Sequence, residues 1–442
     1  MIGQEALEEL ARCNKCGFCL PVCPTYRETG SEVASPRGRL ALMESVALGE
    51  IPVAGEFADA MDLCLGCRAC ERACPSGVRF GRALEAARET AAQAGPAAEQ
   101  GSPAVRRVRG LLLDSVRHRR RLRRAAAGLR LYQRSGGRAL SRALGLGHLL
   151  PGPLGALEPM LPEIAPERVR DDLRRLCRQS ERTGAVTVAL FPGCIMDAVF
   201  APAHVATVQV LAAAGARVRY IEAAPCCGAL HAHAGRRDES RAMARAVIAA
   251  FEASGADMYV NNAGGCGAML HEYPDLLRDD EAWRPRAEAF AARMVDLSVA
   301  LERLPRRLRL RGLGRTVTYQ DSCHLVNGQG VLEPPRRLLG AVEGDTFVDM
   351  PDAQACCGSA GIYNLTRFDM SMRVLDRKMN HCLSVAPQVI VTANPGCTLQ
   401  MRLGTHRRQS RGVQVLHLAE YLAACLVPEA AAVPDAPPQA GG

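Results

Sequence analysis

Short runs of β-branched and aliphatic residues alternate with longer segments of helical periodicity through residues 184–425. The expected strands are 186–191, 217–221, 258–261, 316–319, 346–349 and 389–392. The expected helices between them include 204–214, 238–253 and 367–382. Strands that alternate with helices in this way predict parallel βαβ units, and therefore an α/β architecture for this part of the chain.

The same region repeats itself, and cysteines mark the repeat. Each copy has one cysteine, then an adjacent pair followed by Gly, then a fourth cysteine: Cys194, Cys226, Cys227 and Cys266 in the first copy, Cys323, Cys356, Cys357 and Cys397 in the second. The spacings in the two copies differ by one residue at each step. Each group follows the end of an expected strand, and functional residues of parallel sheets gather beyond these ends. We therefore expect the four thiols of each repeat to converge at one rim.

Two cysteine runs stand in the N-terminal region, each closed by Pro: Cys13, Cys16, Cys19 and Cys23, then Cys64, Cys67, Cys70 and Cys74. This spacing is typical of paired [4Fe–4S] clusters, in which the fourth cysteine of each run ligates the other cluster. The spacing predicts one cluster on Cys13, Cys16, Cys19 and Cys74, and another on Cys64, Cys67, Cys70 and Cys23. Zinc is the alternative, but zinc sites use paired C-x2-C units. The segment between the runs predicts two helices, and so a helical dicluster domain.

Composition narrows the class of protein. The 442 residues suffice for several domains, and no apolar run approaches the ~18 residues of a membrane span. The chain starts without a basic segment followed by an apolar one, so we expect a cytoplasmic protein. In that compartment its 19 cysteines favour metal or redox use over disulfides. The absence of Walker A, G-x-G-x-x-G and H-E-x-x-H patterns removes the usual signatures of ATP hydrolysis, dinucleotide binding and zincin catalysis.

An arginine-rich segment follows the N-terminal region. Between Arg106 and Arg142 there are 13 Arg and one acidic residue, Asp114. Such a segment is compatible with an anionic membrane surface, at about 1 kcal/mol per basic residue near lipid, with an acidic partner, or with a solvated basic helix pair. We expect no nucleic-acid partner, because no reader fold or aromatic platform accompanies the charge. If lipid is the target, the contact is peripheral and at the inner face of the cell membrane.

Several motifs together carry a resemblance to a known family. They are NKCGFCLPVCPTY, SPRGR, CLGCRACERACPSGVRF, the two CCG groups, GCGAMLHEY, CCGSAGIYNLT, DRKMN and VTANPGC. In their order, from about Cys13 to Leu422, the chain resembles the iron–sulfur subunits of bacterial glycolate oxidase (glycolate dehydrogenase), which carry cysteine-rich CCG domains. The resemblance implies electron transfer from FAD on partner subunits, where glycolate becomes glyoxylate, to a quinone-type acceptor. It assigns no catalytic residue to this chain.

The expected organisation is a multidomain α+β protein, with an N-terminal α-helical dicluster ferredoxin domain before a duplicated α/β CCG region. The expected parts are 1–95 for the dicluster domain, 96–183 for the Arg-rich helical linker, 184–300 and 310–425 for the CCG domains, and 426–442 for a disordered tail. Cys177, Cys382 and Cys425 lie in apolar helical surroundings and are interpreted as small buried residues. His231, His233 and His324 flank the CCG groups, where they are either ordinary histidines or groups that tune potentials or accept protons from a quinol.

One departure from related proteins leaves the CCG cysteines open to two interpretations. Heterodisulfide reductase relatives end each repeat with C-x-x-C, whereas Ala263 and Asn394 stand here at the first of those positions. Four thiols per repeat still suffice for a [4Fe–4S] cluster, but a thiol site that has lost its metal fits the same residues. The alternatives for the whole chain are the related subunits of lactate-utilisation, anaerobic glycerol-3-phosphate dehydrogenase and heterodisulfide reductase systems, or an iron–sulfur regulator.

Overall fold

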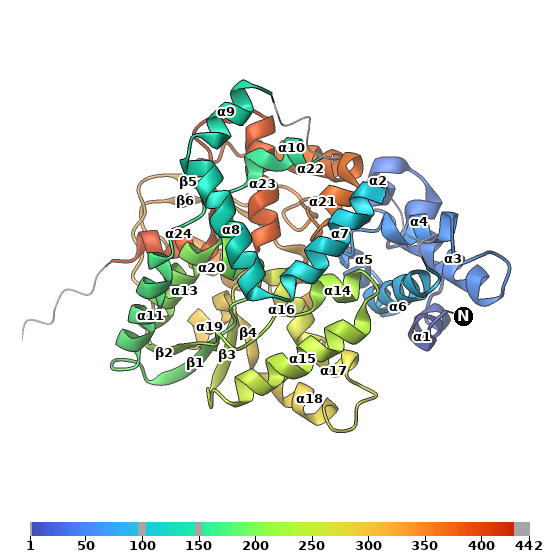
Figure 1. Cartoon of the computed structure of the whole chain (residues 1–442), viewed down its shortest axis with the longest axis horizontal. Coiled ribbons are helices and arrows are strands. Elements are labelled where there is room, and N and C mark those ends of the chain that lie inside the picture. The colour runs from blue at the N-terminus through green and yellow to red at the C-terminus, as the bar shows by residue number, and fades with distance from the viewer. Residues whose placement is uncertain (1, 96–102, 146–152, 428–442) are drawn as a thin grey trace, which may run out of the picture.

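The N-terminal part of the molecule consists of helices that surround the two cysteine runs. The computed structural model describes residues 2–95, 103–145 and 153–427 (Figure 1). The N-terminal elements are α1 (Gln4–Ala11), α2 (Pro24–Thr29), η1 (Glu32–Ala34), α3 (Pro36–Ala47), α4 (Glu56–Asp62), α5 (Ala69–Arg72) and α6 (Phe80–Gln93). The two helices expected between the cysteine runs are α3 and α4. A helical N-terminal domain is confirmed.

The SPRGR segment builds the start of α3. The Ser35 side chain caps the helix by accepting a hydrogen bond from the Gly38 amide at 2.9 Å, and Pro36 occupies the first turn, where a missing N–H costs nothing. Arg39 is fully buried and donates to the carbonyls of Ala60 and Ala34 at 2.7 and 2.8 Å. This guanidinium therefore ties α3 to α4 and to the loop before α3.

The region between the N-terminal helices and the first sheet, which contains the arginine-rich segment, is helical where the structure describes it. Its elements are α7 (Pro103–Val116), α8 (Arg119–Arg134), α9 (Gly137–Ala143), α10 (Leu154–Leu157), η4 (Glu158–Met160) and α11 (Arg168–Ser180). Arg109 pairs with Asp62, Arg117 with Glu239, and Arg123 with Asp197. Much of the basic charge thus holds this segment to the rest of the fold, while Arg120, Arg121, Arg124 and Arg134 are exposed.

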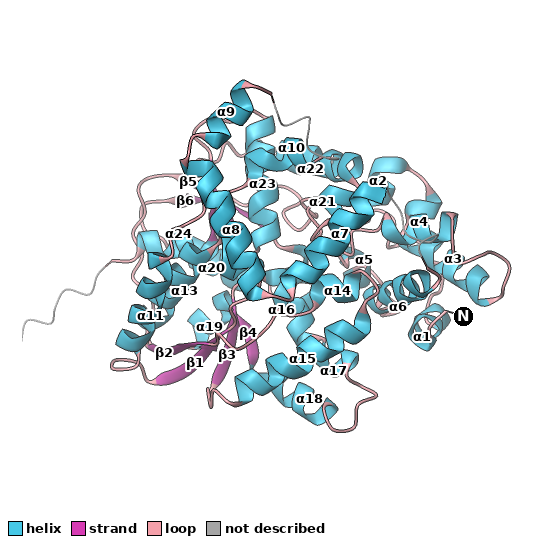
Figure 2. Ribbon diagram, in the orientation of Figure 1, coloured by secondary structure: helices cyan, strands magenta, loops and turns pink. Residues whose placement is uncertain are grey.

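Two four-stranded sheets, both wholly parallel, follow along the chain (Figure 2). The strands are β1 (Val186–Leu190), β2 (Ala216–Tyr220), β3 (Met258–Asn261), β4 (Met294–Asp296), β5 (Thr316–Gln320), β6 (Thr346–Phe347), β7 (Val389–Thr392) and β8 (Gln414–His417). The sheet orders, β2-β1-β3-β4 and β6-β5-β7-β8, correspond strand for strand. The duplication is therefore structural, and the six expected strands are confirmed. The sequence pattern did not reveal β4 and β8, the fourth strand of each sheet.

Helices connect the strands within each repeat. In the first repeat they are α12 (Ile195–Val199), α13 (Ala201–Ala213), α14 (Ala229–His233), α15 (Arg237–Glu252), α16 (Gly264–His271), α17 (Tyr273–Leu276), α18 (Arg284–Arg293) and α19 (Leu297–Arg303). In the second they are η5 (His324–Gly328), a single π-helical turn, then α20 (Glu333–Gly340), α21 (Tyr363–Thr366), α22 (Phe368–Leu383), α23 (Pro395–Arg407) and α24 (Leu418–Cys425). The equivalent residues Asp296 and His417 cap α19 and α24.

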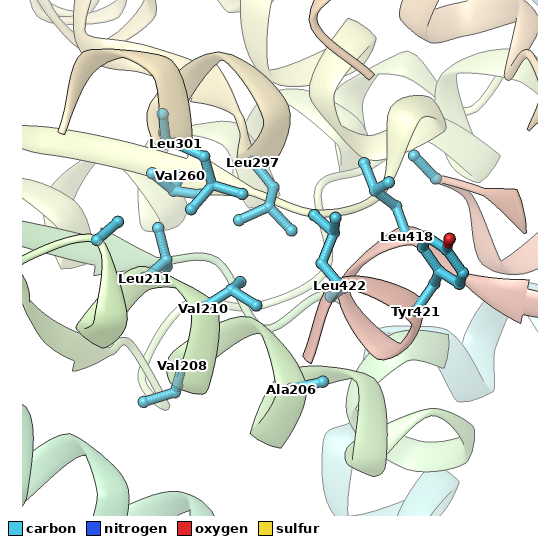
Figure 3. Close-up of a cluster of buried hydrophobic side chains, with 14 of the residues drawn as sticks. Ala206, Val208, Val210, Leu211, Val260, Leu297, Leu301, Leu418, Tyr421 and Leu422 are labelled. Atoms are coloured by element: carbon cyan, nitrogen blue, oxygen red, sulfur yellow. The ribbon is translucent and has the colours of Figure 1, made fainter. Parts of the chain in front are cut away.

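The two repeats share one hydrophobic core. Val208 and Leu211 of α13 belong to the same buried cluster as Leu418 and Leu422 of α24, and Leu297 joins them from the start of α19 (Figure 3). Burying a leucine side chain of this kind contributes about 1.5–3 kcal/mol. The last helix of the second repeat therefore completes the core of the first, and the repeats are not independent units.

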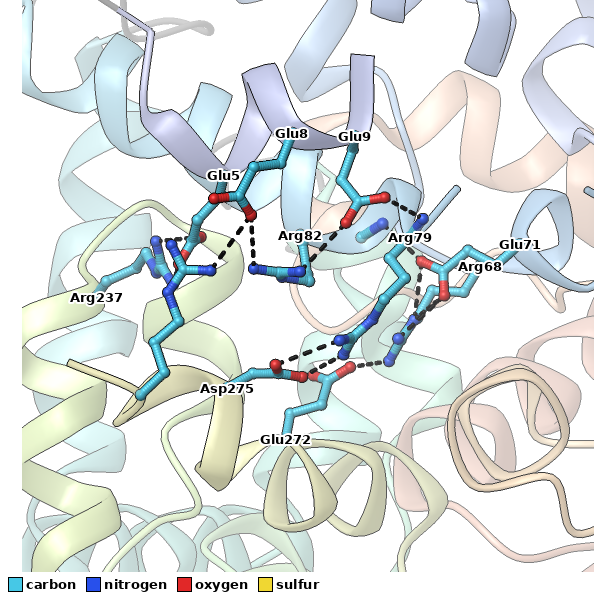
Figure 4. A network of polar contacts seen from close by, with 12 residues as sticks. Glu5, Glu8, Glu9, Arg68, Glu71, Arg79, Arg82, Arg237, Glu272 and Asp275 are labelled. Carbon is cyan, nitrogen blue, oxygen red and sulfur yellow. Dashed lines mark hydrogen bonds and ion pairs between the residues drawn. The ribbon is translucent and has the colours of Figure 1, made fainter. Parts of the chain in front are cut away.

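Ion pairs fasten the helical N-terminal region to both repeats. On the first repeat, Arg237 pairs with Glu5 and Arg79 with Asp275, within a larger network of alternating charges (Figure 4). On the second repeat, Arg367 of the loop before α22 pairs with Asp59 and Asp62 of α4 at 2.6 and 2.8 Å. These contacts fix the cysteine runs against the carboxyl ends of the two sheets.

None of the helices in the described ranges combines the length and apolar character needed to cross a bilayer.

The expected disordered tail, 426–442, lies outside the described residues from 428 onward.

Candidate metal centres and a thiol-lined cavity

The first cysteine set assigned from the sequence lines one pocket at the protein surface. Cys13, Cys16, Cys19 and Cys74 all face it, and Cys70 of the other set borders it. Cys16 is exposed, and the neighbouring Phe18 side chain is 65% exposed. The backbone amide of Val78 donates to the Cys74 sulfur at 3.4 Å. A metal group held here would therefore lie close to solvent.

The second set is buried deeper. Cys23, Cys67 and Cys70 are buried, and Cys64 is half-buried. Burial raises the pKa of the Cys67 thiol well above its usual range, and the charges of Cys356, Cys23 and Cys64 raise it further. Burial likewise raises the pKa of Cys70, together with the charges of Cys67 and Cys64. Thiols packed in this way need a cation before they can all ionise.

The donor chemistry of both sets fits [4Fe–4S] clusters. Each set brings together four cysteines from two distant parts of the N-terminal region, as the two runs predict. Within the described residues, no three His, Cys, Asp or Glu side chains are grouped as ligands of a single metal ion. Backbone amides reach the sulfurs, as the Gly66 amide does to Cys64 at 3.4 Å, and hydrogen bonds of this kind tune cluster potentials.

The cysteines of both repeats line a single cavity of about 310 Å³. The lining cysteines are Cys194, Cys226, Cys227, Cys266, Cys323, Cys356, Cys357 and Cys397, and Cys64 of the N-terminal region joins them. The expected convergence at a strand-end rim is confirmed within each repeat. The two rims also face each other, which the sequence did not indicate. Most of the remaining lining is apolar and includes Leu112, Val116, Leu230, Ile362 and Leu399.

Asn394 connects the two repeats at this cavity. Its side-chain oxygen accepts a hydrogen bond from the Gly265 amide of the first repeat at 3.1 Å. Its side-chain nitrogen lies 3.5 Å from the sulfur of Cys397 and donates to it. Heterodisulfide reductase relatives have a fifth thiol at this position, so here an amide replaces a ligand and bridges the repeats.

The glycine of each CCG group turns the chain away from the paired cysteines. Gly228 and Gly358 have φ values of 86° and 89°, which only glycine adopts without strain. A Cβ on Gly358 would lie 2.6 Å from the backbone oxygen of Ser371, whereas on Gly228 it would meet the Ser240 hydroxyl at the same distance. A backbone atom yields less readily than a side chain. The second repeat therefore requires glycine at this position more strictly than the first repeat does.

Gly358→Ala is expected to destabilise the protein by about 1–3 kcal/mol, through left-handed strain and the clash with Ser371. Gly228→Ala, the matched change in the first repeat, is expected to cost less because the Ser240 side chain can rotate. Urea unfolding of both variants measures the difference. Equal losses of unfolding free energy would contradict this asymmetry.

The second repeat is the one that contacts the buried N-terminal set. His324 Nε2 hydrogen-bonds to the carbonyl of Gly66 at 2.8 Å, and the Asn327 amide donates to the carbonyl of Cys67 at 2.8 Å. Both side chains come from the π-helical turn η5, a conformation common at functional sites. Cys67, Cys356 and Cys323 share one apolar cluster with Tyr363. The cavity thiols of the second repeat therefore lie next to a thiol of the buried N-terminal set.

The remaining candidate histidines and cysteines differ in whether they line the cavity. His233 and His324 line the cavity, whereas His231 is fully buried elsewhere and both its ring nitrogens lack hydrogen-bond partners within the described chain. Cys382 and Cys425 are buried and Cys177 is half-buried, and none of the three lines the cavity. Cys177 and Cys425 lie in the core that the repeats share, whereas Cys382 belongs to the same apolar cluster as the cavity thiols Cys357 and Cys397. Sequence reasoning did not identify Ser322, Tyr363 or Arg88 as cavity residues. Tyr363 lies within the CCGSAGIYNLT motif, but the motif does not show which way its side chain points.

Comparisons with known families match all three parts of the chain. A 4Fe-4S dicluster domain model matches residues 9–78, a cysteine-rich domain model matches 188–271 and 317–402, and a model described as the linker region of the glycolate oxidase iron-sulfur subunit matches 104–161.

Full-length relatives are also found. A probable glycolate oxidase iron-sulfur subunit of Bacillus subtilis is 43% identical over 94% of this chain and 93% of its own length. The glycolate oxidase iron-sulfur subunit of Escherichia coli is 32% identical over 96% of each chain. Lactate utilization protein A of an Exiguobacterium species is 32% identical over 53% of this chain and 96% of its own length.

Proposed function

The chain belongs to the family of glycolate oxidase iron–sulfur subunits, and we propose that it transfers electrons within a flavin-dependent complex that oxidises glycolate to glyoxylate. The observation that carries the proposal is the continuous series of thiols from the exposed Cys16, through the buried second set, to the cavity between the repeats. The chain is then a component of an oxidoreductase complex. FAD and the oxidation of substrate belong to partner subunits.

The proposed cluster ligands are those assigned from the sequence. Cys13, Cys16, Cys19 and Cys74 hold one [4Fe–4S] cluster, and Cys64, Cys67, Cys70 and Cys23 hold the other. Clusters bound in this way supply one-electron transfer. The protein contributes the apolar packing around Cys67, the amide hydrogen bonds to Cys64 and Cys74, and the ion pairs that hold the N-terminal region in place. The cavity thiols form a further metal site or an acceptor site.

The cavity itself is the proposed site of a quinone-type acceptor. Its apolar walls suit a flat, weakly polar ring, and its volume is at the lower end for small-molecule sites. Part of the wall comes from α7, where Leu112 and Val116 face the cavity. Leu131 of α8, Leu140 of α9 and Leu144 are exposed, as are Arg120, Arg121, Arg124 and Arg134 of α8, and this combination supports a peripheral contact with the inner face of the cell membrane.

The proposed domain boundaries remain 1–95, 96–183, 184–300, 310–425 and 426–442. The contact between α13 and α24 adds that the two CCG domains share a core across these boundaries. The proposed location is the cytoplasm, with the membrane contact described above.

Reconstitution tests the function. The isolated chain, purified anaerobically, is expected to show no glycolate-dependent quinone reduction, because it contains no flavin motif. Adding the FAD-bearing subunits should produce that activity, and omitting this chain should abolish quinone reduction. Glycolate and D-lactate are measured side by side, because half of the chain is similar to lactate utilization protein A. Activity of the isolated chain without flavin would overturn the proposal, and activity with lactate alone would change the substrate.

A further inference from the structure

A charged pocket adjoins the thiol-lined cavity. It has a volume of about 40 Å³ and lies between the N-terminal region and the first repeat. Its lining includes three of the ion pairs of Figure 4: Arg68 with Glu272, Arg79 with Asp275, and Arg237 with Glu5. Four residues line both spaces: Gly66, Arg88, His233 and His324. These residues form the wall between a polar pocket and an apolar cavity.

His233 is firmly positioned in that wall. Its Nδ1 atom hydrogen-bonds to the Glu85 carboxylate at 2.8 Å, and Arg88 donates to its backbone carbonyl at 3.1 Å. Its ring lies edge-on to the ring of His324, with 5.6 Å between the centroids. The described residues offer no hydrogen-bond partner for the other ring nitrogen, Nε2. One nitrogen thus binds a carboxylate, and the other remains available for an acceptor.

Two carboxylates that line the charged pocket have pKa values shifted in opposite directions. Burial opposes ionisation of Glu85, but the hydrogen bond to His233 and the nearby arginines lower its pKa, so the carboxylate is charged. Burial raises the pKa of Glu272 to about 7, against the opposing effect of Arg68. The charged and titratable groups that act on His233 or its partners are Glu85, Glu272, His324, Arg68, Arg88 and Arg237.

We propose that His233, supported by Glu85, delivers protons from the charged pocket to a two-electron, two-proton acceptor in the thiol-lined cavity. This inference rests on the proposed function, which supplies the electrons and places a quinone in the cavity. A quinone that takes two electrons from the reduced chain must also bind two protons, one on each oxygen, to become the hydroquinone. The His233 imidazolium gives up a proton and regains one from water through the charged pocket.

The test compares two acceptors for the same reduced chain. Full-length protein, purified anaerobically, reduced and freed of excess reductant, is mixed rapidly with ferricyanide, which takes only electrons, or with menadione, which also needs protons. His233→Asn is expected to slow menadione reduction by about 10²-fold. Ferricyanide reduction and iron content should not change. Asn keeps an amide donor for Glu85 but cannot carry a proton at neutral pH.

Glu85→Gln provides a second variant, should His233→Asn fold poorly, and it is expected to show the same selective slowing. The matched control is Glu89→Gln, one turn further along α6, where the carboxylate pairs with Arg237 but lines neither space. His233→Ala should regain menadione reduction when imidazole is added. Normal menadione reduction by His233→Asn, or equal slowing with both acceptors, would overturn the inference. Unmodified protein that reduces ferricyanide but not menadione would instead overturn the quinone in the proposed function.

Discussion

Cys67→Ser is expected to remove one iron–sulfur cluster and to reduce electron transfer through the chain to background. The anaerobically purified protein should contain about eight irons from the N-terminal sets, and the variant should lose about four of them. Cys67 is the member of the second set that packs directly against Cys356 of the cavity. Its loss therefore removes a ligand and disturbs the junction between the N-terminal thiols and the second repeat.

Iron and acid-labile sulfide assays, with electron paramagnetic resonance of the reduced protein, measure the effect. Cys177→Ser is the matched control, because Cys177 is half-buried in α11 and far from both thiol sites in the apolar core. Its iron content should equal that of the unmodified chain. Unchanged iron in Cys67→Ser would remove this residue from the ligand set, and stoichiometric zinc without sulfide would replace the iron–sulfur assignment.

Asp197→Asn is expected to cost about 3–5 kcal/mol of unfolding free energy, because it leaves the buried Arg170 and the half-buried Arg123 without their counter-charge. The Asp197 side chain is 1% exposed and accepts hydrogen bonds from Arg123 at 2.9 and 3.0 Å and from Arg170 at 2.7 Å. It thus fastens α8 and α11 to α12, whose first residues, Ile195 and Met196, line the cavity. Denaturant unfolding measures the loss, and Glu252→Gln, at an exposed pair with Arg286, should cost under about 1 kcal/mol.

The same carboxylate makes stability depend on pH in a definite direction. Burial alone would raise the pKa of Asp197, but Arg123, Arg170 and Arg119 lower it from 3.8 to about 2. The stabilisation is therefore complete above pH 4 and is lost as the pH falls through 2, by about 2 kcal/mol. Asp197→Asn should lack this part of the acid dependence. Identical acid unfolding profiles would show that the pairing contributes nothing.

The fold was predictable where local pattern determines it. The strands β3 and β7 coincide with the expected ranges 258–261 and 389–392, because buried parallel strands carry short aliphatic runs. The three residues of β4 are too few to form such a run, so their place at the sheet edge depends on tertiary contacts. Likewise, the charge of the segment from Arg106 to Arg142 was evident, but its partners Asp62, Asp197 and Glu239 are distant in the sequence.

The candidate site was predictable in its parts and not in its assembly. The spacing of the cysteines in the sequence was enough to group the thiols of each run and of each repeat, because each group lies within one segment of the chain. That both repeats face one cavity depends on how the two sheets pack, to which residues such as Asn394 and Gly265 contribute. Arg88, which lies in the wall between the charged pocket and the cavity, belongs to no sequence motif. It became a candidate only because it lines both the charged pocket and the cavity.

The shared core of the repeats has a consequence for synthesis on the ribosome. The face of α13 needs Leu418, Tyr421 and Leu422 of α24, which is the last helix described in the chain. At about 5–20 residues per second, α13 waits on the order of 10–40 s for this partner. During that time the thiols of the first repeat are without the opposite wall of their cavity. The nascent chain, rather than the finished protein, is then the form in which oxygen reaches Cys226 and Cys227 most easily.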